Sequence, residues 1–202
     1  MNQPENTSKF KIDWVNLPSD IIPISLWDCL HDAKLLKISS DLYDRSVTIE
    51  FGAYHIFEYH EMSEDMRFVF EFEKVTSARV CKYSIWPGKF ERPDNISRDE
   101  ERRLVDEYQS KWREESLGWD DFLKIIQDKE NNFDISHSEF ATKGNEMAFR
   151  IEGMLNGSLY HEIFLKASNL IIKKSDGEII SIDQFLRLGQ EFWNDFEERA
   201  NK

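Results

Sequence analysis

Two stretches of this chain alternate apolar and polar residues with the two-residue period of a half-buried β-strand. In residues 31–85, the run RFVFEFEK at 67–74 is the clearest example, and in residues 133–181 it is MAFRIE at 147–152. A sheet with one apolar face must bury that face against a second layer. The pattern therefore predicts an α+β fold, in which antiparallel strands from the two regions pack as a β-sandwich or partial barrel.

A helical insertion is predicted between the strand regions, over residues 97–129. Ser97 and Glu100 have the spacing of a capping box, in which each side chain satisfies a backbone N–H at the start of a helix. Gly118 ends this first helix, and a second short one follows it. The segment 54–59, in contrast, is expected to be extended and rich in aromatic residues.

A last helix is predicted over 182–199. Ser181 and Gln184 form a second capping box, and a single apolar stripe follows at Phe185, Leu188, Phe192, Trp193 and Phe196. We expect this stripe to dock on the core.

Short turn signals divide the second region into hairpins. Asn156-Gly157 and Asp176-Gly177 are pairs that favour two-residue hairpin turns. The run FEKVTS at 72–77 also resembles FLKASN at 164–169, and each joins two strands. Either the two regions are related four-strand units that pack face to face, or this short match arose by chance.

The chain is expected to form a single domain. Residues 1–20 read as a polar leader without a secretory signal, and 21–202 as one α+β domain. Cys29 and Cys81 are the only cysteines and are widely spaced, which fits a reducing compartment. We therefore expect a cytoplasmic protein.

The formal net charge of −13 limits the classes of partner. Such a charge repels the phosphate backbone of nucleic acids and an anionic membrane surface. It attracts a basic protein. No phosphate-binding loop, dinucleotide-binding glycine motif or zincin motif occurs, so the sequence predicts no cofactor.

A few side chains are candidates for a site, each with a simpler structural alternative. Glu58 and His60 would share one face of an extended segment and supply two metal ligands, fewer than a metal site normally needs. His31 and Asp32 are adjacent on a predicted strand start, so their side chains should point apart rather than form a dyad. Trp86 and Phe90, in the loop WPGKFER, either contact a partner or pack under the helices.

One run resembles a known group of domains. The sequence LHDAKLLKISSDLYDRSVTIEF at 30–51, followed by FVFEFEKVTSARV, resembles small bacterial "HDA" domains, some of which are grouped with immunity proteins of polymorphic toxin systems. The resemblance covers about a quarter of the chain. It implies a sheet domain that binds a protein partner and has no catalytic residues.

The sequence therefore favours a bacterial, non-enzymatic, immunity-like binding protein with a basic partner. Two alternatives stay open. One is a small-molecule-binding protein or metal-dependent enzyme with its site in the sheet, using some of His31, Glu58, His60, His137 and His161. The other is a structural subunit of a larger assembly.

Overall fold

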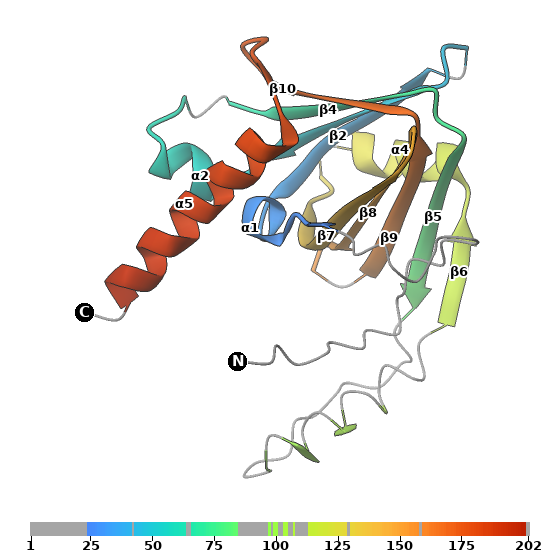
Figure 1. Ribbon diagram of the computed structural model, residues 1–202. Coiled ribbons are helices and arrows are strands. Elements are labelled where there is room, and N and C mark those ends of the chain that lie inside the picture. The colour runs from blue at the N-terminus through green and yellow to red at the C-terminus, as the bar shows by residue number, and fades with distance from the viewer. Residues whose placement is uncertain are drawn as a thin grey trace.

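The architecture comes from a computed structural model of the full chain (Figure 1). The structure describes residues 24–41, 43–63, 66–84, 97, 99–100, 103–104, 107, 113–128, 130–157 and 159–200. Eleven strands lie in these ranges: β1 (Ile24–Ser25), β2 (Lys34–Asp41), β3 (Ser46–Gly52), β4 (Phe68–Glu73), β5 (Ser77–Ser84), β6 (Arg113–Leu117), β7 (Phe133–Lys143), β8 (Glu146–Leu155), β9 (Leu159–Ala167), β10 (Asn169–Lys174) and β11 (Ile179–Ile180). The helices with described bounds are α1 (Trp27–Leu30), α2 (Tyr54–Tyr59), α4 (Trp119–Gln127) and α5 (Ile182–Ala200).

All the strands belong to one antiparallel sheet, so the α+β prediction is confirmed. The order along the sheet is β11-β10-β4-β3-β2-β7-β8-β9-β5-β6, and β1 pairs with β7 beside this path. Only two residue pairs join β2 to β7 at the centre. Figure 1 shows the strands on either side of this joint running in different directions, with α1 in the angle between them.

The strand order has a two-fold relation that the chain order hides. Suppose that β2 and β7 are exchanged, then β3 and β8, and so on up to β6 and β11. The resulting strand order, read from the opposite end of the sheet, is identical to the original order. The outer strands of the two halves are therefore exchanged: β5 pairs with β9, and β10 pairs with β4. The local approximate two-fold axis passes close to the central pair of Lys34 with Asp134.

The registers follow the same relation. One row of paired residues crosses the first half at Ile180, Ile172, Phe70, Ile49 and Ile38, and its equivalent crosses the second at Leu117, Val80, Ile163, Ile151 and Ser138. A bulge also falls at the same place in each half, between Leu35 and Lys37 and between Ile135 and His137. Topology and register thus have the form that an internal duplication would produce.

Helices α4 and α5 are equivalent in this relation. Each follows the outer strand of its half, and the segments LGWDDFLKIIQD (117–128) and ISIDQFLRLGQE (180–191) align without a gap. Phe122 of α4 and Phe185 of α5 occupy matching positions, and both are fully buried. The match proposed between 72–77 and 164–169 is one residue out of step in the strands, because Phe72 is equivalent to Leu165 rather than to Phe164.

The two halves share one aromatic core. Phe149 of the second half packs against rings of the first, with centroid distances of 5.7 Å to Phe70 and 5.1 Å to Phe72. Phe185 of α5 lies against Phe68 and Phe70 at 4.9 and 5.2 Å. This burial of large rings from both regions confirms that they pack against each other.

Local predictions succeed where the signal is local. Both bonds of the predicted Ser181–Gln184 capping box form, and the Glu100 N–H donates to Ser97 Oγ at 3.3 Å. The turn at Asn156-Gly157 has the positive φ values, 52° and 66°, that this pair tolerates.

Two local predictions are wrong. Residues 54–59 form helix α2 instead of extended chain, because Ile56 and Phe57 turn into the core from one face of a short helix. Residues 113–117, expected inside a helix, form β6, because they complete the edge of the sheet against β5.

Candidate functional site

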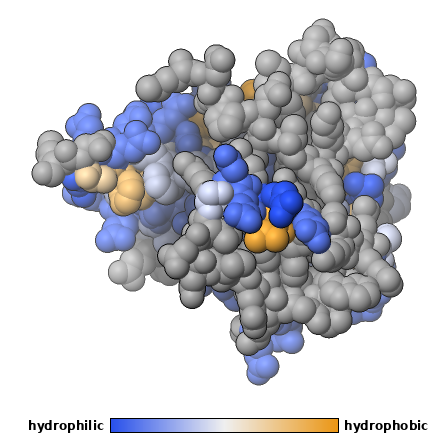
Figure 2. All heavy atoms as spheres, turned by 90° about the horizontal axis from the view of Figure 1, so that it is seen from below, coloured by the Kyte–Doolittle hydropathy of each residue, from blue (hydrophilic) through white to orange (hydrophobic). Residues whose placement is uncertain are grey.

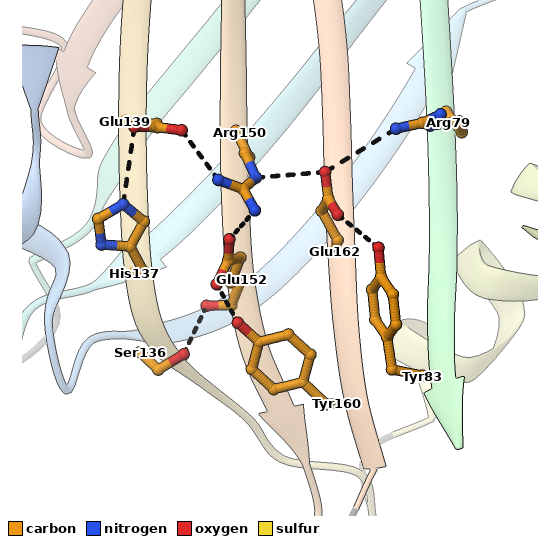
Figure 3. Close-up of polar contacts among 9 residues, drawn as sticks. All are labelled: Arg79, Tyr83, Ser136, His137, Glu139, Arg150, Glu152, Tyr160 and Glu162. Carbon is orange, nitrogen blue, oxygen red and sulfur yellow. Dashed lines mark hydrogen bonds and ion pairs between the residues drawn. The ribbon is translucent and has the colours of Figure 1, made fainter. Parts of the chain in front are cut away.

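A polar network covers the face of the second half opposite the aromatic core (Figure 3). Its members come from neighbouring strands β7, β8, β9 and β5, which bring together residues far apart in the chain. The network consists of Arg79, Tyr83, Ser136, His137, Glu139, Arg150, Glu152, Tyr160 and Glu162. We refer to it as the Arg150 network.

Arg150 lies at its centre and contacts three carboxylates. Its guanidinium donates to Glu139 at 3.0 Å and to Glu162 at 3.2 Å, and it also pairs with Glu152. The Arg150 side chain is only 2% exposed, so these contacts replace water around a buried cation. The three carboxylates raise the pKa of Arg150 against the opposing effect of burial, which keeps it charged.

The pKa values of Glu139 and Glu152 shift in opposite directions. At Glu152, burial dominates and raises the pKa above its ordinary value, although Arg150 opposes the shift. At Glu139, burial also raises the pKa, but the hydrogen bonds and charges of His137 and Arg150 together lower it below its ordinary value. Of these two carboxyl groups, Glu152 therefore holds a proton more readily, and Glu139 is held ionised.

Two tyrosines close the network on one side. Tyr83 donates its hydroxyl to Glu162 at 2.8 Å, and Tyr160 donates to Glu152. Burial and the Glu152 charge raise the pKa of Tyr160, so its hydroxyl keeps its proton. Arg79 lies near the other carboxylate oxygen of Glu162. The guanidinium carbon of Arg79 also lies 5.7 Å from the centroid of the Phe164 ring.

The first half provides an internal comparison for this face. Thr48 occupies the position equivalent to Arg150, and the pair Lys37–Glu50 occupies the position equivalent to His137–Glu152. The Lys37 and Glu50 side chains are 58% and 29% exposed, typical of a solvated cross-strand pair. The Arg150 network is thus a buried specialisation of one half, which the shared fold does not require.

Sequence reasoning missed most of this network because of the strand period. Arg150 and Glu152 alternate with Phe149 and Ile151, and polar residues at alternate strand positions ordinarily face water. In β9, Glu162 likewise stands between two residues that the fold buries, His161 and Ile163. Chemically, the network places a proton-holding carboxyl, Glu152, beside the cation of Arg150 and the phenol of Tyr160.

His31 and Asp32, the predicted binding pair, lie in the turn between α1 and β2. They point toward each other, with 3.1 Å between His31 Nδ1 and Asp32 Oδ2, so the expectation that they point apart is wrong. The reason is backbone geometry: Asp32 has a φ of 62° and lies in a turn, where strand alternation does not apply. The His31 ring also packs on Trp27 at 4.4 Å.

Glu58 and His60, the candidate metal ligands, belong to α2 and its C-cap instead of an extended segment. Glu58 is exposed, whereas His60 Nε2 lies 3.0 Å from the carbonyl oxygen of Leu188. Within the part of the chain that the structure describes, no group of three or more His, Cys, Asp or Glu side chains is placed to hold a metal ion.

The other histidines are not gathered into one site. His137 belongs to the Arg150 network, and His161 is buried in the core near Phe122 and Phe133. Trp86 and Phe90 lie outside the described residues.

A second feature is an aromatic surface where α5 crosses α1 and α2. We call Trp27, Tyr59, Phe192, Trp193 and Phe196 the aromatic face. Trp193 lies 4.9 Å from Trp27, Phe192 lies 5.7 Å from Tyr59, and Phe196 is 53% exposed. Helix α5 approaches α1 closely here because Gly189 has no side chain; a Cβ would lie 2.5 Å from the Asp28 carbonyl oxygen.

No protein-family model, curated protein or solved structure matches this chain. In the described ranges, no helix is both long enough and apolar enough to cross a membrane.

Proposed function

We propose that this chain is a non-enzymatic binding protein of the immunity type, and that its aromatic face binds a basic protein partner. The observation that carries this proposal is the apolar stripe of α5, which continues after the helix leaves the core. The resemblance of residues 30–51 to HDA domains supports the same class of function.

The α5 stripe has two parts with different surroundings. Phe185 and Gly189 are buried, as expected for a helix docked on a core. Further along, Phe192 and Trp193 are half-buried and Phe196 is exposed, and Figure 1 shows the C-terminal end of α5 projecting beyond the sheet. An exposed apolar surface carries a solubility cost, and aromatic residues are those most often found at the centre of protein interfaces.

The charges around the aromatic face indicate the sign of the partner. Helix α5 carries five carboxylates and two arginines, and the exposed Glu58 and Glu61 lie on and just after α2. In Figure 2, hydrophilic side chains surround hydrophobic ones on the side where Figure 1 places the end of α5. An aromatic centre with an acidic rim favours a partner that inserts arginine or lysine side chains, since these pair with carboxylates and stack on rings.

The test uses purified products of the genes adjacent to this one, beginning with the most basic, in titration calorimetry and size-exclusion chromatography with the full chain. We expect one of them to form a one-to-one complex whose affinity falls as salt is raised. Phe196→Ala and Phe192→Ala should each weaken it by about 30-fold or more, the effect of removing an interface hot spot.

Met154→Ala is the matched control, because Met154 is an exposed apolar side chain on β8, away from α5. It should leave the affinity unchanged. The proposal is wrong if no adjacent product binds, or if the two phenylalanine variants bind as tightly as the Met154 variant.

A further inference from the structure

Two clefts occupy equivalent positions in the two halves. One, of about 590 Å³, lies between the β2–β3 turn, the start of β5 and the start of α4. The other, of about 260 Å³, lies between the β7–β8 hairpin, β10 and the start of α5. The strand registers make Ser40 equivalent to Phe140 and Ala78 equivalent to Leu170. The ungapped alignment of α4 with α5 makes Gly118 equivalent to Ser181 and Trp119 equivalent to Ile182.

The side chains at these positions explain the difference in volume. In the second half, Phe140, Leu170 and Ile182 fill the space with apolar groups. In the first half, Ser40 and Ala78 replace the two larger residues and leave the cleft open. Removing buried apolar volume costs stability when nothing replaces it. Packing alone therefore does not explain why the first half has small side chains at these two positions and leaves the cleft open.

Charged groups also distinguish the larger cleft. Trp119 forms part of its wall and places its indole N–H 3.4 Å from Ser40 Oγ, while Val47 and Val75 supply apolar surface. Two carboxylates in it are already used: Asp41 accepts the backbone N–H groups of Tyr43 and Asp44, and Asp121 pairs with Lys124 at 3.1 Å.

Two opposite charges remain in this cleft. Neither Arg45 nor Asp120 has an ion pair with another residue that the structure describes. A guanidinium favours a carboxylate, to which it can donate two parallel hydrogen bonds, and a carboxylate favours an ammonium group. The cleft is large enough for a small molecule, and its lining combines an aromatic and aliphatic wall with several polar and charged side chains.

We infer that this cleft binds a small zwitterion of the amino-acid or short-peptide class. Arg45 pairs with its carboxylate, Asp120 pairs with its ammonium group, and Trp119 with Val47 contacts its apolar side chain. The carboxylates in the cleft repel a nucleotide or other polyanion, and the positive charges of Arg45 and Lys124 repel a polycation. The site is separate from the aromatic face and does not depend on the proposed partner.

The test is protein-observed NMR with the full chain, titrated with phenylalanine and a leucyl-phenylalanine dipeptide up to about 10 mM, the range of weak binding. N-acetyl-phenylalanine and phenylalanine amide are the matched controls, since each lacks one charge. We expect saturable shifts at Trp119 and Gly118 with the zwitterions. Blocking either charge, or changing Arg45→Met or Asp120→Asn, should weaken binding about tenfold or more.

A variant that restores the packing of the other half is the sharpest control. Ser40→Phe with Ala78→Leu should abolish ligand binding, leave the protein folded and leave partner binding by the aromatic face unchanged. The inference is overturned if no zwitterion binds, if the blocked analogues bind equally well, or if this double variant still binds. Binding of an arginine-rich peptide in place of the zwitterions would also overturn it and would make the cleft part of a protein interface.

Discussion

Replacing Arg150 by methionine should expose how the buried network is held together. The substitution keeps an unbranched side chain of similar length but leaves Glu139, Glu152 and Glu162 without their shared cation. A pair of unit charges at about 4 Å is worth ~4 kcal/mol at an effective dielectric constant of ~20, and the cost of burying the ions cancels much of this. Breaking a buried pair by removing one partner typically costs about 3–5 kcal/mol, and we expect that loss in the free energy of unfolding at pH 7.

Urea denaturation followed by circular dichroism measures this loss, with Lys37→Met as the matched control. Lys37 pairs with Glu50 on the matching face of the first half, at the place equivalent to His137–Glu152, but it is exposed, so its loss should cost less than about 1 kcal/mol. The loss of unfolding free energy in the Arg150 variant should also be smaller at pH 5 than at pH 7, because protonation removes the charge of the carboxylates that have lost Arg150. A loss below 1 kcal/mol at pH 7, or a deficit that grows at low pH, would refute this account of the network.

Three further predictions concern α5 and its contacts. Gly189→Ala should destabilise the protein by about 1–3 kcal/mol in urea denaturation, because the new methyl group meets the α1 backbone. The control Gln190→Ala, on the exposed side of α5, should change stability by less than about 0.5 kcal/mol. Ser181→Ala should cost about 1 kcal/mol by removing the helix cap, and an unchanged urea midpoint would contradict the role of the capping box. His55 of α2 lies with its ring 5.0 Å from that of Phe192 on α5, and burial lowers its pKa below the ordinary value. Its contribution to stability is therefore complete above about pH 6.5 and is lost as the pH falls. His55→Phe should flatten the plot of unfolding free energy against pH between pH 7 and pH 5, and an identical slope would show that another group titrates there.

The parts of the fold that were predictable from sequence are those set by neighbouring residues. Asn156-Gly157 defines a turn because both residues tolerate positive φ, and Ser181 caps α5 because its hydroxyl reaches the Gln184 N–H. The segment 54–59 was harder, because a short run of aromatic residues satisfies both strand and helix patterns. There, contact with the core determined the outcome.

The candidate sites were predictable only in part, for the same reason. Phe192 and Phe196 were placed on one stripe of a helix, and the structure keeps them there, but only the finished fold shows that the core ends before this part of the helix. The spacing of Arg150 and Glu152 showed which face of the strand they share, while their burial depends on the neighbouring strands. Register with β7 and β9 brings Glu139 and Glu162 beside them.

By itself, the sequence determined most of the strand segments, the final helix with its cap, the turns and the acidic character of this protein, because the local elements depend on residues close together in the chain and the charge depends on composition alone. The tertiary structure alone decided that β5 joins β9 and β10 joins β4, since that exchange joins segments about ninety residues apart and is favoured only when both halves close over one core. It also decided which half buries a charged network and which keeps an open cleft. The two halves share a topology, and the side chains at equivalent positions make the difference.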